Sequence, residues 1–340
     1  MSDGRLPLVA GNPTLRDVAA AAGVHVSTVS KVLGETGIVV RPETRDRIMT
    51  AVRELRYRPN ASARSLRLKR TGALGMLIPD FTNPVYATIV RGAVRRAEEL
   101  GYVMLLAEIR ANAPEAYRHL VLENRIDGLI IATARASGSL ARELRRENVP
   151  HVFVNRRVRG ARRSVTVDDA AGAALAAEAL YARGHRRIGM IAGPNDTDTA
   201  RRRAAGFTRA CARMGVKPLV SREQPYTREG GFAAMESLLA RQRKPTGVFA
   251  SNLLAGIGAL AALHQHGFEV PGDVSLVTFD DESAEFTHPP LTAVRFPLSE
   301  MGALAVDELK RVLAGEEPSD VVVQTPPVLV ERASLGPPRS

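Results

Sequence analysis

The pattern of apolar residues changes near residue 72, and this change constrains the fold more than any other feature. Up to about Lys69 the chain shows only helical periodicity and no convincing strand. From Gly72 onward, short apolar runs alternate with longer amphipathic stretches, which is typical of a parallel sheet with crossover helices. The sequence therefore predicts a small all-helical module followed by an α/β core.

The apolar runs of the core form two series, which predict two lobes. The first series lies at 72–78, 102–107, 127–132 and 151–155, with helices that begin near Val85, Pro114 and Ser139. The second lies at 186–193, 246–251 and 273–281, with helices near 170–183, 199–214, 229–240 and 253–266. A helix over 298–313 and a strand over 321–324 are expected to recross between the lobes. Two doubly wound lobes in tandem imply a ligand-binding cleft at the carboxyl ends of their strands.

Positive charge is concentrated at the start of the chain. The formal net charge is +11, and residues 1–70 carry +7 of it, from 13 Lys or Arg against 6 Asp or Glu. Such a basic segment suits the neutralisation of nucleic-acid phosphates. Charge alone does not establish DNA binding, since many basic proteins never touch nucleic acid.

Cysteine content and the first residues bear on the cellular compartment. The single cysteine, Cys211, excludes an intramolecular disulfide framework, and we expect it to be inert within a helix. Residues 1–14 lack the basic segment and apolar run of a secretory signal. The longest apolar stretch, 247–263, is interrupted by polar residues and glycines and does not suit a membrane span. We therefore expect a soluble cytoplasmic protein.

A helix-turn-helix is predicted over residues 14–33. Thr14 is a good N-cap for a helix over 15–22, Gly23 breaks that helix, and a second helix follows over 26–33. In this motif the second helix enters the major groove with its N-terminus first. The candidates for base contacts are Val26, Ser27 and Lys31, and those for phosphate contacts are Thr14 and Thr28. Taken alone, the segment is also compatible with an ordinary helical hairpin.

Two further helices are expected before the core. The first runs from residue 42 or 43 to 56 and completes a three-helix module. The second opens at Pro59 and Asn60 and is too short to be stable alone in water. Within it Leu66 can act as a wedge between base steps of the minor groove, while arginines such as Arg64 neutralise phosphates. The alternative for this segment is a solvated basic linker.

The segments TLRDVAAAAGVHVSTVSKVL and RPETRDRIMTAVRELRYRPNASARSLR strongly resemble the LacI/GalR family of repressors. The resemblance continues through GMLIPDFTNPVY, RIDGLIIA, GHRRIGMIAGP, TARRRAAGF, PGDVSLVTFDD and PPLTAVR, and so covers about 14–333. It implies an all-α helix-turn-helix headpiece, a hinge helix that folds on the operator, and an α/β core of two doubly wound parallel-sheet lobes that is similar to periplasmic sugar-binding proteins.

The resemblance also implies a domain layout and an assembly. The expected parts are a headpiece at 1–58, a hinge helix and linker at 59–70, and an effector-binding and dimerisation core at 72–335. Within the core we expect an N-subdomain at about 72–158 and 296–322, and a C-subdomain at about 159–295 and 323–335. Two subunits pair, each headpiece takes half of a pseudo-palindromic operator, and the paired Leu66 side chains kink its centre. The last residues carry no heptad pattern, so a dimer is expected rather than a tetramer.

Family positions, transferred one at a time, imply the site residues. The base-reading residues fall on Val26, Ser27 and Lys31, and the intercalating leucine falls on Leu66. The effector-binding residues fall on Asn155, Arg203, Asn252 and Asp280. The residues expected to line the cleft are Asp80, Tyr86, Tyr226 and Phe296. Because arginine and carboxylate groups bind paired hydroxyls and aromatic faces stack on sugar rings, the set predicts a sugar or sugar derivative as the effector.

Four positions depart from the family pattern. His25 stands where relatives usually carry a serine that caps the recognition helix and contacts a phosphate. Asn155 replaces a common acidic residue, and Leu253 replaces the Asp that usually follows Asn252. Arg41 replaces a small capping residue before the third helix.

We therefore predict a transcriptional regulator, with repression favoured, in which the effector changes the orientation of the lobes and thereby the ordering of the hinge helices. The alternatives are an enzyme on the same scaffold and a ligand-binding protein without regulatory function. The sequence lacks a GxGxxG after its first strand, a GxSxG elbow, and HExxH or CxxC signatures, so we expect no catalytic residue, cofactor or metal. Whether the effector releases or retains the operator stays open.

Overall fold

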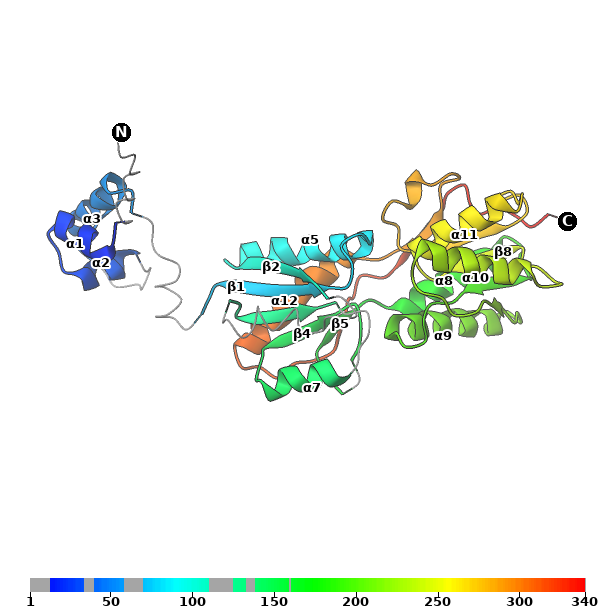
Figure 1. The fold of residues 1–340 in the computed structure, drawn as a ribbon, viewed down its shortest axis with the longest axis horizontal. Coiled ribbons are helices and arrows are strands. Elements are labelled where there is room, and N and C mark those ends of the chain that lie inside the picture. The colour runs from blue at the N-terminus through cyan, green and yellow to red at the C-terminus, as the bar shows by residue number, and fades with distance from the viewer. Residues whose placement is uncertain are drawn as a thin grey trace, which may run out of the picture. The chain divides into compact units, whose positions relative to one another are not determined.

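The computed structural model describes residues 13–33, 40–57, 70–109, 125–132, 138–158 and 160–339. The chain divides into two compact units, residues 1–71 and 72–340, each of which is treated by itself below (Figure 1). Two predicted helices, the hinge helix that opens at Pro59 and the helix near Pro114, fall on residues outside the described ranges. The same holds for three predicted DNA contacts, Asn60, Arg64 and Leu66.

The first unit contains a three-helix module. Its helices are α1 (Leu15–Ala22), α2 (Val26–Leu33) and α3 (Pro42–Glu54), which confirms the predicted helix-turn-helix and third helix. The helices enclose a small apolar core made by Val18, Ala19, Ala22, Val29, Ile48, Ala51 and Tyr57. Gly23 ends α1 with φ +61°, a left-handed conformation that glycine adopts without a Cβ penalty. The turn between α1 and α2 therefore has a local cause in the sequence.

The second unit begins with a lobe built on a parallel sheet in the order β11-β5-β4-β3-β1-β2. Its strands are β1 (Ala73–Ile78), β2 (Val103–Glu108), β3 (Gly128–Ile131), β4 (His151–Val154), β5 (Ser164–Thr166) and β11 (Val321–Val322). Helices α5 (Pro84–Glu99) and α12 (Leu298–Leu313) pack together on one face, and α7 (Gly138–Arg146) packs on the other. This is the first doubly wound lobe that the sequence predicts.

The second lobe repeats this plan with a sheet in the order β12-β10-β9-β8-β6-β7, in which only β12 pairs antiparallel. Its strands are β6 (Ile188–Ile191), β7 (Leu219–Val220), β8 (Gly247–Ala250), β9 (Ser275–Phe279), β10 (Thr292–Arg295) and β12 (Val328–Val330). Its helices are α8 (Asp169–Ala182), α9 (Asp198–Arg213), α10 (Arg228–Leu239), α11 (Leu253–Gln265) and the 3-10 turn η1 (Ala284–Phe286). Helices α8 and α9 pack together, as do α10 and α11.

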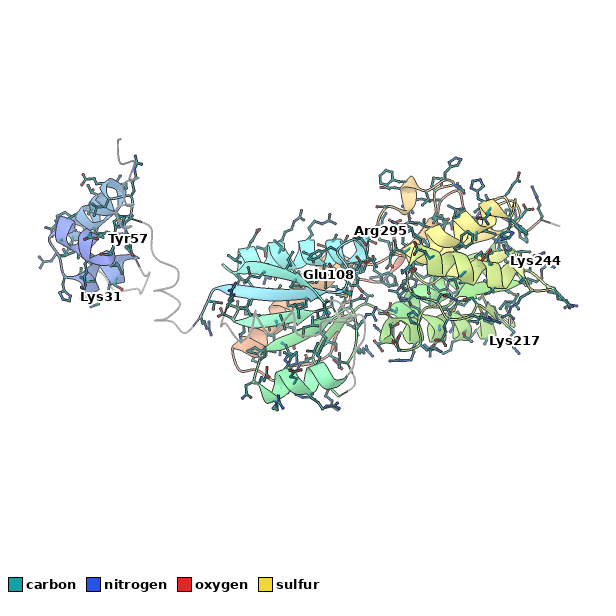
Figure 2. The ribbon with its side chains drawn as sticks, in the orientation of Figure 1. Lys31, Tyr57, Glu108, Lys217, Lys244 and Arg295 are labelled. Carbon is teal, nitrogen blue, oxygen red and sulfur yellow. The ribbon has the colours of Figure 1, made fainter. Side chains whose placement is uncertain are left out.

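The chain crosses between the lobes three times. The first crossing follows β5, which pairs with β4 in the first sheet, so it lies after Thr166 and not near the expected residue 158. The second joins β10 to α12 through Phe296 and Pro297, and the third joins β11 to β12. In Figure 2, Glu108 at the end of β2 and Arg295 at the end of β10 lie near the boundary between the lobes. The carboxyl ends of both parallel sheets therefore face this boundary.

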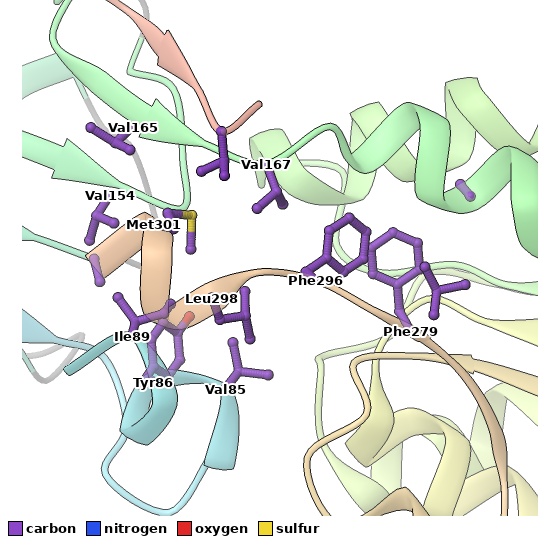
Figure 3. Packing of buried hydrophobic residues seen from close by; sticks show 14 of the residues in the cluster. Val85, Tyr86, Ile89, Val154, Val165, Val167, Phe279, Phe296, Leu298 and Met301 are labelled. Carbon is purple, nitrogen blue, oxygen red and sulfur yellow. The ribbon is translucent and has the colours of Figure 1, made fainter. Parts of the chain in front are cut away.

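A continuous row of aromatic rings supports the second crossing. Phe207 stacks on Phe249, with ring centroids 4.8 Å apart, and Phe279 lies 4.6 Å from Phe296 in the crossing segment. Figure 3 shows these last two rings beside each other, with Leu298 and Tyr86 of the first lobe beyond them. At Gly172 of α8 an added Cβ would lie 2.3 Å from Phe296, so only glycine leaves room for that ring. Apolar packing thus runs across the boundary.

Candidate functional site

The N-terminal end of α1 is fixed by a capping box. The Thr14 hydroxyl accepts from the backbone N–H of Asp17 (3.4 Å) and donates to its carboxylate (2.8 Å), which also accepts from the Thr14 N–H (2.7 Å). These hydrogen bonds lower the pKa of the Asp17 carboxyl below its usual value. A phosphate contact by Thr14, predicted above, therefore competes with the Asp17 carboxylate for the hydroxyl proton.

The start of the predicted recognition helix is capped by an imidazole. His25 Nδ1 lies 3.3 Å from the backbone nitrogen of Ser27 and 2.8 Å from its hydroxyl oxygen. The His25 carbonyl accepts from the N–H groups of Thr28 (2.9 Å) and Val29 (3.4 Å). The cap that the serine-to-histidine departure puts in question is thus made by the histidine ring.

The other predicted DNA contacts on α2 differ in their exposure to solvent. Lys31 is exposed on the last turn of α2 (Figure 2). Ser27 is also exposed, whereas Val26 and Thr28 are half-buried. Val26 packs against the core of the three-helix module. Of the three side chains expected to contact bases, Ser27 and Lys31 are exposed and lie outside that core.

In the second unit a cavity of about 540 Å³ opens between the lobes. The first lobe contributes Asp80 and Tyr86 from the segment after β1, and Arg156 from the segment after β4. The second lobe contributes residues 194–197, after β6, and 223–226, after β7. All of these segments leave the carboxyl end of a parallel strand, which is where ligands bind in open α/β sheets. Three predicted residues, Asp80, Tyr86 and Tyr226, line this cavity.

Beside Tyr226 lies a buried cluster of charged groups. Arg203 on α9 is 5% exposed, its Nε donates to Asp169 Oδ1 (2.7 Å) and its Nη1 donates to the Ser251 carbonyl (2.6 Å). Asp280 Oδ2 lies 3.8 Å from Arg203 Nη1. The guanidinium also stacks over Phe279, 4.1 Å from the ring centroid, and lies 5.9 Å from that of Tyr226. The structure therefore brings together the predicted residues Arg203, Asp280 and Tyr226.

Burial and ion pairing act in opposition on the ionisation of this cluster. Burial by itself lowers the pKa of the Arg203 guanidinium, but the Asp169 and Asp280 carboxylates raise it above its usual value. Burial raises the pKa of the Asp280 carboxyl to about 6, against the opposing effect of Arg203. Asp280 Oδ1 has no hydrogen-bond partner among the described residues. A buried carboxylate oxygen without a partner is suited to accept a hydrogen bond from a bound molecule.

Arg202 connects this cluster to the first lobe. Its Nη2 lies 2.9 Å from Asp169 Oδ2, so Asp169 is shared between Arg202 and Arg203. The Arg202 guanidinium also donates to the carbonyls of Val167 and Asn155, both at 3.2 Å. Helix α9 of the second lobe is therefore tied through Arg202 to the segment that follows β4 in the first.

The remaining predicted effector residues have structural partners. Asn155 is buried with φ +70°, and its carbonyl is the one that Arg202 holds. Asn252 is buried and its side chain caps α11 by accepting from the Ala255 N–H (2.9 Å). Phe296 belongs to the aromatic row at the second crossing. Like Arg203 and Asp280, these three are not among the residues that line the cavity described above.

Comparison with known proteins decides the family. Residues 14–60 match the model for bacterial regulatory proteins of the lacI family, and residues 177–335 match the periplasmic binding protein-like domain. The ribose operon repressor of Escherichia coli strain K12 is 35% identical over 329 residues, which are 94% of this chain and 99% of that protein. The chain belongs to the lacI family. Another relative of this lacI-family chain, the HTH-type transcriptional regulator DegA of Bacillus subtilis strain 168, is 33% identical over 95% of the chain and 98% of its own length.

Solved structures of lacI-family regulators share the fold. The lac repressor dimer bound to operator and the anti-inducer ONPF superimposes with a TM-score of 0.84 at 29% identity, covering 96% of this chain and 100% of that one. A regulator from Enterococcus faecium with bound ribose gives a TM-score of 0.68 at 26% identity, covering 78% of this chain and 100% of that one. The family and fold class expected from the sequence are confirmed, and this lacI-family chain is a DNA-binding transcriptional regulator and not an enzyme.

Sequence reasoning missed two residues of the lacI-family site. Asp169 is fully buried and holds both arginines, and Arg156 is 4% exposed and lines the cavity. Asp169 follows β5, a three-residue strand that the apolar pattern does not reveal. Its position after a strand end becomes informative only once that strand is recognised.

Proposed function

We propose that this lacI-family regulator is a repressor that binds a pseudo-palindromic operator as a homodimer and responds to a sugar or sugar derivative in the interlobe cavity. The proposal is carried by Tyr226, which lines that cavity, and by the buried pair of Arg203 and Asp280 directly behind it. A guanidinium can donate to two neighbouring hydroxyl oxygens, a carboxylate can accept from hydroxyl protons, and an aromatic ring can cover an apolar sugar face. The cavity volume of about 540 Å³ is ample for a monosaccharide or disaccharide.

The names of relatives support the same ligand class. Among them are a ribose operon repressor, a regulator solved with ribose and the regulator CelR solved with cellobiose. We assign effector binding to the full predicted set, in which the cavity-lining residues contact the ligand and the buried ones shape its site. The set consists of Asp80, Tyr86, Asn155, Arg203, Tyr226, Asn252, Asp280 and Phe296.

We assign operator binding to the headpiece at 1–58 and to the hinge at 59–70, which precede the effector-binding core at 72–335. The proposed DNA contacts are Thr14, His25, Val26, Ser27, Thr28, Lys31, Asn60, Arg64 and Leu66. Effector binding alters the angle between the lobes and so the spacing of the two hinge helices in the dimer. A regulator of this kind acts in the cytoplasm, where the operator lies.

The surface of the first lobe favours a second copy of the chain as partner. Strand β2 lies at the edge of its sheet, with Val103 63% exposed and Leu106 40% exposed. A groove of about 410 Å³ beside it is lined mainly by apolar residues, including Phe81, which is 50% exposed, and Val90. A contiguous exposed apolar area of this kind marks an interaction site. Self-association covers it and places two headpieces on one operator.

Thermal unfolding with D-ribose, cellobiose and other sugars tests the effector assignment. A sugar that binds the folded core raises the melting temperature of the wild-type chain. Arg203→Lys, which retains the charge but loses the two-pronged donor, should reduce the shift, while the surface change Arg209→Lys on the same helix should not. If no sugar or sugar derivative moves the melting temperature, the effector assignment is wrong.

A further inference from the structure

We propose that His25 determines which bases Ser27 accepts, by fixing the Ser27 hydroxyl as a hydrogen-bond acceptor toward the operator. The proposal rests on the operator-reading role assigned to Ser27 above. His25 itself does not need to touch a base. It acts through Ser27 and is therefore a positioning residue for sequence readout.

The backbone of α2 settles the state of the imidazole. His25 Nδ1 lies 3.3 Å from the backbone nitrogen of Ser27, and a backbone N–H can only donate. For this hydrogen bond Nδ1 must present its lone pair, which places the ring proton on Nε2. The same Nδ1 lies 2.8 Å from the Ser27 hydroxyl oxygen. Because Nδ1 has no proton to give, the hydroxyl donates to it, and the single lone pair of Nδ1 is shared between the hydroxyl and the backbone N–H in a three-centre hydrogen bond.

This contact uses the single proton of the Ser27 hydroxyl. A serine hydroxyl otherwise rotates and serves as donor or acceptor, and so can meet any base. With its proton held by His25, the exposed oxygen of Ser27 offers only lone pairs to the major groove. Those lone pairs can accept from the N4 amino group of cytosine or the N6 amino group of adenine, and cannot bond guanine N7, guanine O6 or thymine O4.

A serine at position 25 would cap the helix without this effect. Its hydroxyl has both a proton and lone pairs, so it can accept from the Ser27 N–H and leave the Ser27 hydroxyl free to rotate. Asparagine, in contrast, places its Oδ1 at the same number of bonds from the backbone as His25 Nδ1, and that oxygen only accepts. The chain thus allows three informative variants. His25→Asn keeps the cap and the acceptor polarity, His25→Ser keeps the cap alone, and His25→Ala loses both.

The test begins with in vitro selection of the full chain against a library of random DNA duplexes. Comparison with Ser27→Ala identifies the base pair whose preference depends on Ser27. That pair is then rebuilt with base analogues that lack either the exocyclic amino group on one strand or the exocyclic oxygen on the other. Binding of each duplex is measured by fluorescence anisotropy at fixed salt, since phosphate contacts make affinity salt-dependent.

Loss of the amino group should weaken binding of the wild type and of His25→Asn about five- to tenfold, and that of Ser27→Ala less than twofold. Loss of the oxygen should change wild-type binding less than twofold. His25→Ser should lose less than the wild type when the amino group is removed, because its Ser27 hydroxyl can turn and donate instead. His25→Ala adds a general loss of affinity on every duplex, since its helix is also uncapped.

Two results would overturn the inference. If the wild type responds to loss of the oxygen instead of the amino group, Ser27 is a donor and His25 does not hold its proton. If His25→Ser responds as the wild type does, the histidine only caps the helix. A different result concerns the proposed function: if Ser27→Ala changes no base preference while operator binding persists, Ser27 does not read sequence. If the wild type selects no sequence at all, operator binding itself fails.

Discussion

Replacement of Asp169 by alanine should destabilise the core far more than its size suggests. The carboxylate is fully buried and is shared by two arginines, at 2.7 Å from Arg203 Nε and 2.9 Å from Arg202 Nη2. Breaking a buried pair by removal of one partner costs about 3 to 5 kcal/mol, because the other charge stays buried. Arg203 retains the Ser251 carbonyl at 2.6 Å and Asp280 at 3.8 Å, so we expect a loss of about 3 kcal/mol in the free energy of unfolding.

The neighbouring Asp168 supplies a matched control. Its carboxylate is exposed and caps α8 by accepting from the Ala171 N–H at 2.9 Å. Loss of such a cap costs about 1 kcal/mol, so Asp168→Ala removes the same group from the adjacent residue with a smaller penalty. Urea unfolding without effector, followed by far-UV circular dichroism because the chain has no tryptophan, measures both. If Asp169→Ala loses no more stability than Asp168→Ala, the shared carboxylate does not hold the two arginines as argued.

Three further predictions follow from contacts described above. Arg202→Lys keeps a positive charge beside Asp169 but cannot hold both carbonyls, at Val167 and Asn155, so it should lower the free energy of unfolding by about 1 to 2 kcal/mol; an unchanged urea midpoint would contradict this. Val103→Asp introduces charge on the exposed edge strand and should shift the chain from dimer to monomer in analytical ultracentrifugation, whereas a persistent dimer would place the interface elsewhere. The pKa of Asp280 is raised from 3.8 to about 6 on folding, so the folded chain binds more protons between these values and loses stability as pH rises through that window. Asp280→Asn should lose less between about pH 4 and pH 7 in urea titrations, and an equal loss in both proteins would refute the assignment.

Elements with local causes could be predicted from the sequence with accurate bounds. The first and last residues of α1, α2 and α12 match the predicted ones. The signals that set these bounds, such as the N-cap Thr14, the terminating Gly23 or an apolar stripe, lie in or directly beside the helix in the sequence. Strands β3, β4, β6 and β8 have only four residues each, but they lie within longer apolar runs and were predicted. Strands β5, β7, β10 and β12 lack such runs and were missed. Sheet pairing, and not any local pattern, makes these segments strands.

The same distinction applies to the candidate site. Arg203 and Asp280 were identified through family positions, and the structure brings them to 3.8 Å. Asp169 was not identified, although it is the closest charged partner of Arg203, because the two lie 34 residues apart and meet only when α8 packs on α9. Val26 was expected to project outward, yet it is half-buried and packs against the small apolar core of its module.

The threefold crossing of the chain has a consequence for biosynthesis. The first lobe takes α12 and β11 from residues 298–322, and Met301, Ala305 and Leu309 of α12 are fully buried in it. A ribosome has therefore translated nearly all of the second lobe before the first can complete its core. Throughout this interval the nascent chain keeps the α12-facing surface of the first sheet uncovered. A premature stop in the second lobe would thus leave both lobes unfinished, however much of the first had already been made.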